Sequence, residues 1–254
     1  MSFIAAFQFL TSIPLPRRLA ANQEALGRSA VYFPVVGLII GLILAGLNWL
    51  FSLALPPAIV KALLLVALVI ITGALHLDGF VDTCNGIAGH KAVEDRWRVM
   101  HDSRAGAFGI VGVALLLLVK YVALSNVPPF FMTATLIFMP VVSRWAVVHA
   151  IFIHPYAHSS GLGTTFKQAT RWPQFTAATL ITIIVALALL PLFSLIGLLI
   201  IPGVWIITAL FSVYLKRKFS GLTGDTYGAI NEVAEVAVLV VASLIVNTGM
   251  VHPI

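Results

Sequence analysis

The sequence predicts an all-α, polytopic integral membrane protein with about seven transmembrane helices, folded as one domain over residues 1–254. Two observations carry this prediction. The chain is 60% hydrophobic and only 9% charged, whereas soluble domains carry roughly 25% charged residues. Its apolar residues also gather in long runs, and roughly 20 of them are enough for one helix to cross a bilayer. We therefore expect the lipid bilayer to be the solvent of this chain.

Four apolar runs in the first part of the chain predict four spans. The third run contains Lys120 and the fourth contains Arg144. A charge inside a span is costly, so both residues need a partner or a function. The four runs cover residues 31–55, 57–75, 109–127 and 129–153.

Residues 175–215 form an almost uncharged run that is too long for one span. At 1.5 Å per residue the run would reach roughly 60 Å, about twice the hydrocarbon thickness. We expect it to turn back near Pro191 and to supply two spans. The last span is predicted from Val233 to Met250, and the residues before Arg17 are expected to lie at the membrane interface.

The charged residues predict the orientation of the chain. With the N-terminus in the cytoplasm, seven alternating spans place the basic loops on the cytoplasmic side, as the positive-inside rule requires. These loops explain the net charge of +6, so we expect no nucleic-acid partner. The acidic residues and most histidines fall on the same side. Such a one-sided polar face favours an active site over a transporter, whose polar groups usually lie near the bilayer midplane.

The stretch "HLDGFVDTCNG" holds the first candidate site. Asp78 and Asp82 are four residues apart, so a helix presents both carboxylates on one face, where Asn85 joins them. Two adjacent carboxylates repel each other, and a magnesium ion with bound phosphate removes the conflict. Gly79 and Gly86 are expected to let a phosphate approach the backbone. The alternative is a solvated helix end at the membrane surface.

A second acidic cluster lies before the last predicted span. Asp225, Glu232 and Glu235 are spaced by seven and three residues, again one helical face. We expect Asp225 and Glu232 to share the magnesium site of the first cluster, with nearby basic side chains binding phosphates. For Asp225 the alternative is a role as N-cap of the last helix.

Several motifs together resemble the cobalamin synthase family, the adenosylcobinamide-GDP ribazoletransferases. The resemblance covers nearly the whole chain. It rests on "FLTSIPLP", "LHLDGFVDTCNG", "MHDSRAGAFG", "VSRW", "SGLGTTF" and "GLTGDTYGAINEVAE", which occur in the order of the family. The chain departs from the family pattern at Asn85, where we expect an aspartate, and at Arg98, where we expect an acidic residue.

The resemblance implies a reaction and its partners. The substrates would be adenosylcobinamide-GDP and α-ribazole or its 5'-phosphate. The ribose hydroxyl would attack the phosphorus on the cobinamide side, and GMP would leave with Mg²⁺ as cofactor. The location implied is the bacterial cytoplasmic (inner) membrane, with a homo-oligomer left open. A CDP-alcohol-type phosphotransferase acting on lipid is the alternative enzyme, although its "DGxxAR" signature is absent.

The candidate site residues fall into three groups. The expected catalytic residues are Asp78, Asp82 and Arg104. The expected magnesium ligands are Asp78, Asp82, Asp225 and Glu232. The expected substrate-binding residues are His76, Asn85, Asp102, Arg104, Arg144, Lys218 and Thr223.

Overall fold

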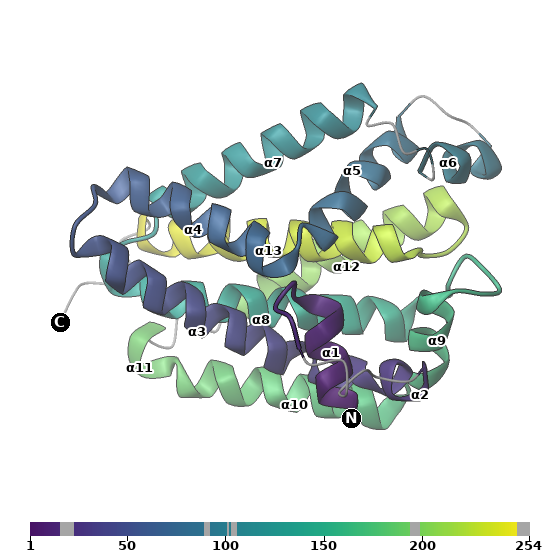
Figure 1. Cartoon of the computed structure of the whole chain (residues 1–254), viewed down its shortest axis with the longest axis horizontal. Helices are drawn as coiled ribbons and strands as arrows, with labels where there is room; N and C mark the ends of the chain where they lie inside the picture. The colour runs from purple at the N-terminus through teal and green to yellow at the C-terminus, as the bar shows by residue number, and fades with distance from the viewer. Residues whose placement is uncertain (16–22, 89–91, 101, 103–105, 194–198, 248–254) are drawn as a thin grey trace.

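The computed structural model describes residues 1–15, 23–88, 92–100, 102, 106–193 and 199–247. Every regular element within these ranges is helical, apart from one isolated bridge between Tyr156 and Leu222. The all-α class is therefore confirmed (Figure 1). The elements are α1 (Ser2–Leu10), α2 (Gln23–Gly27), the 3-10 helix η2 (Arg28–Tyr32), α3 (Phe33–Ser52), α4 (Pro57–Thr72), α5 (Leu75–Ile87), α6 (Val93–Met100), α7 (Ala107–Ser125), α8 (Pro129–Ile153), α9 (Leu162–Ala169), α10 (Trp172–Ala188), α11 (Leu190–Phe193), α12 (Ile200–Phe219) and α13 (Gly224–Asn247).

Among the described residues, five helical segments are long and apolar enough to cross a membrane. They are Glu24–Ser52, α7, α8, α12 and Gly224–Leu244. The pairs α4–α5 and α9–α10 are bent by 91° and 89°, and they raise the number to seven if each pair counts as one span. The polytopic membrane class is thus confirmed, and the prediction of seven spans matches the upper number.

The predicted end of the second span was wrong. The second span ends at Thr72 because Gly73 and Ala74 adopt left-handed backbone angles, with φ of 60° and 57°, and turn the chain into α5. The last helix begins at Gly224, before the span predicted from near Val233, so all three residues of the second acidic cluster lie on one continuous helix, as their spacing predicted. The expected turn near Pro191 is present, since α10 ends at Ala188 and α11 follows.

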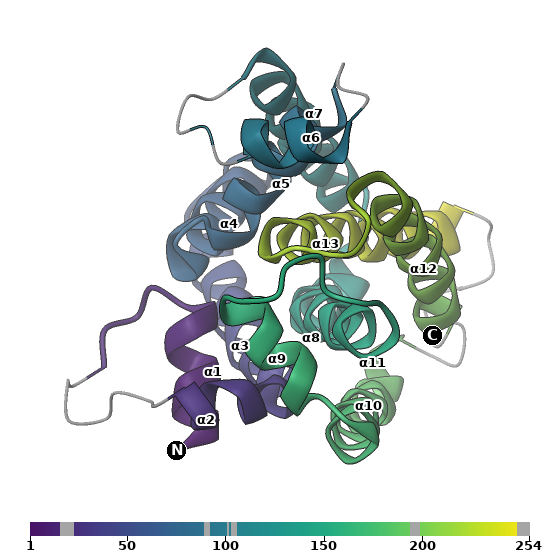
Figure 2. The same cartoon turned by 90° about the vertical axis from the view of Figure 1, so that its right-hand side faces the viewer.

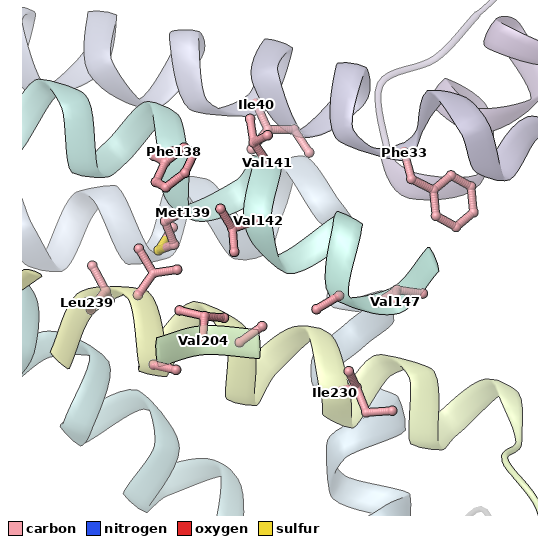
Figure 3. Packing of buried hydrophobic residues seen from close by; sticks show 14 of the residues in the cluster. Phe33, Ile40, Phe138, Met139, Val141, Val142, Val147, Val204, Ile230 and Leu239 are labelled. Carbon is pink, nitrogen blue, oxygen red and sulfur yellow. The ribbon is translucent and has the colours of Figure 1, made fainter. Parts of the chain in front are cut away.

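Helix α8 forms the centre of the bundle, and most of its side chains are buried. It packs closely against α3 because Gly37 and Gly41 have no side chains. A methyl group added at Gly37 would lie 2.3 Å from the carbonyl oxygen of Pro140, which leaves no room for it. Such small residues four apart are a common device for close helix packing in membranes. In Figure 3, Val141 and Val142 of α8 lie among side chains from the neighbouring helices.

The polar connections gather at one end of the bundle. In Figure 1 that end, on the right, holds α6, α9 and the turn between α12 and α13. The turns α3–α4, α7–α8 and α10–α11 lie at the opposite end. Figure 2 looks onto the polar end and shows α13 between α5 and α8. The described parts of the loops that the sequence assigns to one side of the membrane therefore lie at one end of the bundle.

Candidate functional site

The site begins where α5 crosses α13. A methyl group added at Gly79 would lie 2.7 Å from the carbonyl oxygen of Asp225, and one added at Gly228 would lie 3.0 Å from that of His76. The two backbones therefore touch at the level of both acidic clusters. The expectation that Gly79 leaves room for a phosphate was wrong, because α13 occupies that space. Gly86 in turn makes room for Met100 and Phe219.

A cavity of about 340 Å³ lies beside this crossing. Its polar side chains come from four places in the chain: α5, α8, the loop after α8, and the start of α13. They include His76, Asp78, Arg144, Tyr156 and Asp225. The two acidic clusters thus meet at this cavity through Asp78 and Asp225, as the sequence led us to expect. Its remaining lining is mostly glycine, aliphatic and phenylalanine side chains.

The start of α13 is capped by threonines rather than by Asp225. The backbone N–H of Thr223 donates to Thr226 Oγ1 at 2.7 Å, and the N–H of Thr226 donates to Thr223 Oγ1 at 3.2 Å. This reciprocal pair satisfies the helix start in the manner of a capping box. The alternative role of Asp225 as N-cap was therefore wrong. Thr223, predicted to bind substrate, is buried and serves as the cap instead.

Tyr156 is a cavity residue for which the sequence predicted no role. Two backbone bonds hold its loop against the turn before α13: Ala157 N–H donates to Leu222 O at 2.8 Å, and Leu222 N–H donates to Pro155 O at 2.9 Å. Burial, and then the nearby charge of Asp225, raise the pKa of the Tyr156 phenol. The shift is away from neutral pH, where an ordinary tyrosine is already protonated, so the phenol remains a hydrogen-bond donor. The polar run "HPYAHSS" was the only sequence signal for this residue.

A buried network of four charges lies behind the cavity. Lys120 Nζ lies 2.5 Å from Glu232 Oε2 and 2.6 Å from Glu235 Oε2, and Arg144 Nη1 lies 2.7 Å from Glu235 Oε1. Asn231 Nδ2 donates to the same Glu235 Oε1 at 3.1 Å. Buried charges are tolerable only when they are paired, and here two cations face two anions.

This network corrects one prediction and supports another. Glu232 was expected to bind magnesium, but its carboxylate pairs with Lys120, and the residue lines a separate small cavity with Lys120 and Glu235. The structure therefore does not support Glu232 as a magnesium ligand. Arg144, which was expected to need a partner inside the bundle, pairs with Glu235.

Arg144 keeps part of its hydrogen-bonding capacity unused. The side chain is fully buried, and its Nε and Nη2 have no partner among the described residues. Within the same ranges, His76 Nδ1 also has none. An unmade buried hydrogen bond costs roughly 1–3 kcal/mol, and more for a charged group. Because guanidinium groups bind phosphate through two parallel N–H bonds, an anionic ligand in the cavity is a fitting partner for Arg144.

The side chain of Asn85 holds two helices together and does not line the cavity. Its Oδ1 accepts a hydrogen bond of 2.7 Å from the backbone N–H of Gly109, near the start of α7. The side chain is buried between α5 and α7 and does not line the cavity. The expected role of Asn85 in binding metal or substrate therefore finds no support in this geometry.

Three of the remaining predicted residues, Asp82, Asp102 and Lys218, lie outside the cavity lining. Asp82 is one helical turn further along α5, and Asp102 is an exposed residue after α6. Lys218 packs over the ring of Tyr214, with its Nζ 5.6 Å from the ring centre. Arg104 lies outside the described residues. The roles of Asp82, Asp102 and Arg104 stay predictions.

Replacing Asn85 should affect stability more than chemistry. Asn85→Ala leaves the Gly109 N–H without an acceptor, so we expect a loss of roughly 1–3 kcal/mol in the free energy of unfolding. Asn85→Asp keeps an acceptor and should retain turnover. Thermal unfolding in detergent, measured beside turnover, checks both variants. An Asn85→Ala protein with an unchanged melting temperature and no turnover would contradict this prediction and would indicate that Asn85 takes part in the reaction.

The cavity offers a donor set that suits magnesium. The described residues contain no group of three or more histidine, cysteine, aspartate or glutamate side chains placed to hold a metal ion. Magnesium does not need such a group, because it keeps several waters and is usually bound by one or two carboxylates and the phosphates of a substrate. Asp78 and Asp225 supply two carboxylates at one cavity.

Comparison with known proteins gives one consistent family. The family model described as cobalamin-5-phosphate synthase matches residues 2–243. An adenosylcobinamide-GDP ribazoletransferase of Geotalea daltonii is 38% identical, over 93% of this chain and 94% of its own length. Proteins with the same name from Roseiflexus sp. and Desulforamulus reducens are 36% and 37% identical, over 94% and 92% of this chain and 88% and 92% of their own lengths. No solved structure matches the chain.

Proposed function

Because the chain belongs to the cobalamin-5-phosphate synthase family, we propose that the cavity beside α5, α8 and α13 is where its reaction takes place. The reaction is the final step in assembly of the cobalamin nucleotide loop, a transfer between adenosylcobinamide-GDP and ribazole. The single observation that carries the proposal is the meeting of Asp78, Asp225 and Arg144 at one cavity.

Each of these residues has a distinct role in the proposed site. Asp78 and Asp225 hold magnesium, which when bound neutralises the charge of the donor pyrophosphate. Arg144 donates its unused Nε and Nη2 to phosphate oxygens, while Glu235 holds its Nη1. Tyr156 keeps its proton and donates a hydrogen bond at the same wall.

The bond changes follow from the substrates. An oxygen of the ribazole ribose attacks the phosphorus on the cobinamide side of the pyrophosphate. The bond from that phosphorus to the bridging oxygen breaks, GMP leaves with the electron pair, and the proton of the attacking hydroxyl is released to solvent. In phosphoryl transfer, positioning and charge neutralisation supply most of the catalysis. The cavity residues provide both functions without a covalent intermediate on the protein.

A turnover assay tests this function against its alternatives. Purified protein should release GMP only when adenosylcobinamide-GDP, α-ribazole and Mg²⁺ are all present. Activity on a CDP-alcohol and a lipid instead would support the other phosphotransferase. Solute uptake into proteoliposomes without GMP release would support a transporter.

We also propose that the polar end of the bundle faces the cytoplasm from the bacterial inner membrane. The support is the basic residues at that end, including Arg96 and Arg98 of α6 and Lys216 to Lys218 in the last turn of α12. In a Cys84→Ser background, Arg98→Cys should react with an impermeant maleimide only after cells are permeabilised. Asn126→Cys, at the opposite end, should react in intact cells. The reverse pattern would overturn this orientation.

A further inference from the structure

The cavity has two chemically different walls. Its polar side chains come from α5, α8, the loop after α8 and the start of α13, as described above. The wall formed by α1, α3 and α9 carries three phenylalanines, Phe9, Phe33 and Phe166. Their ring centres lie 6.0 Å (Phe9–Phe33), 5.0 Å (Phe9–Phe166) and 5.5 Å (Phe33–Phe166) apart. We call these three residues the aromatic wall.

We propose that the aromatic wall binds the base of the ribazole acceptor and so determines which lower base is incorporated. This inference rests on the proposed function and adds residues that select one substrate. Phenylalanine rings offer stacked or edge contacts to a flat aromatic base. The rings offer no hydrogen bond to replace those that a base makes with water. A base with few polar edge atoms therefore loses the least free energy when it enters the cavity.

The size of the cavity supports the acceptor as its occupant. A volume of about 340 Å³ lies near the lower end of the range for pockets that hold drug-sized ligands. A nucleoside is of that size, whereas a corrin macrocycle carrying a nucleotide is far larger. The donor therefore inserts its pyrophosphate toward Asp78, Asp225 and Arg144 and keeps its corrin ring outside. The guanine of the donor is also a flat base, but its amino, imide and carbonyl groups would find no hydrogen-bond partner on three phenylalanines. The aromatic wall therefore suits the acceptor base better.

The N-terminal helix has a defined place in this wall. Ser12, just after α1, donates its backbone N–H to Ile71 O at 2.7 Å and its hydroxyl to Ile70 O at 2.5 Å. These bonds tie the chain after α1 to the end of α4. Phe9 and Leu10 consequently line the cavity. The segment that the sequence assigned to the membrane interface thus also contributes to the predicted base-binding subsite.

The chemistry of the wall sets the expected selectivity. An apolar subsite buries the exocyclic amino group of an adenine base without a partner, which costs free energy. Apolar pockets discriminate between similar substrates by about 10- to 200-fold. The wild-type protein should therefore use α-ribazole with a kcat/KM roughly 10- to 100-fold higher than that for the corresponding adenine riboside.

Two wall variants and one matched control test the proposal. Phe166→Leu and Phe9→Leu should each raise the KM for α-ribazole about tenfold, while the KM for adenosylcobinamide-GDP stays within about twofold. The control is Phe152→Leu. Phe152 is also a phenylalanine in an aromatic cluster, stacked on Phe175 at 4.6 Å, but it does not line the cavity. Its replacement should leave both KM values unchanged. Phe9 is only partly buried, so its variant tests the wall even if Phe166→Leu folds poorly.

The outcomes separate this inference from the proposed function. A wild-type protein that releases no GMP with both substrates contradicts the proposed function itself. A wild type that turns over, together with wall variants that keep the acceptor KM or raise only the donor KM, overturns the aromatic wall alone. Equal use of α-ribazole and the adenine riboside by the wild type also overturns it.

Discussion

Replacing Glu235 by glutamine is expected to be the most damaging single substitution for the stability of the bundle. Its carboxylate faces both Lys120 and Arg144, at 2.6 Å and 2.7 Å, and only 1% of its side chain is exposed. Without this charge, two buried cations share one anion, Glu232. Breaking a buried ion pair costs about 3–5 kcal/mol, a large part of a total stability of about 5–15 kcal/mol. Thermal unfolding in detergent should show a large drop in melting temperature.

Two comparisons test whether charge balance is the reason. Glu24→Gln removes a carboxylate that pairs with Arg28 at 3.0 Å, but both side chains are largely exposed. Exposed pairs contribute little, so its melting temperature should barely change. The double variant Lys120→Met with Glu232→Leu removes one cation and one anion and leaves Arg144 paired with Glu235. It should be more stable than Glu235→Gln and should retain turnover. A double variant as unstable as Glu235→Gln would contradict this account.

The largest effect on turnover is expected from the two cavity aspartates. Asp78→Asn and Asp225→Asn each remove one negative charge from the proposed magnesium site. Each should lower kcat about a hundred- to thousandfold, the usual cost of losing one well-placed electrostatic group. Because both residues serve one unit, the double variant should lose little more than either single variant. Initial rates over a range of Mg²⁺ concentrations measure this.

A surface aspartate at the same end of the bundle serves as the control. Asp95 pairs with Arg98 at 3.2 Å and is about half exposed. Asp95→Asn should keep turnover and the magnesium requirement of the wild type. Additive losses in Asp78→Asn with Asp225→Asn would mean that the two aspartates act separately.

The sequence predicted the fold class, and the meeting of Asp78 and Asp225 at one cavity, for physical reasons. Long apolar runs are sufficient to predict membrane helices, because a bilayer admits few other structures. Helical spacing and the shared membrane side brought Asp78 and Asp225 together as candidates. The bend between α4 and α5 was missed because it depends on the left-handed angles at Gly73 and Ala74, which an apolar run does not reveal.

The prediction that Glu232 binds magnesium with Asp225 was wrong because of the distance between them along the helix axis. Seven residues along a helix return to the same face, but they also advance by about 10 Å along its axis. Magnesium ligands lie at about 2.0–2.1 Å from the ion, so Asp225 and Glu232 share a face without sharing a site. The actual partner of Glu232 is Lys120, from α7. Only the packing of α7 against α13 brings these two residues together.

The contacts of Asn85 and Thr223 were hidden for a similar reason. Asn85 lies on the predicted helical face, but its amide is used to hold the start of α7 at Gly109. The run "LTGDT" contains three possible capping residues, and the backbone bonds select the two threonines. Local spacing identifies the residues that a site can use, whereas tertiary contacts decide which of them remain available.

Metal binding measured without turnover is the most direct test of the central claim that Asp78 and Asp225 share one site. Manganese can replace magnesium as a paramagnetic probe, and its bound fraction can be followed by electron paramagnetic resonance in detergent with inorganic pyrophosphate present. We predict that Asp78→Asn and Asp225→Asn each weaken manganese binding at least about tenfold, which corresponds to about 1.4 kcal/mol, and that Asp95→Asn leaves it unchanged. Wild-type affinity in the Asp225→Asn protein, with binding lost in Asp78→Asn, would contradict the shared site.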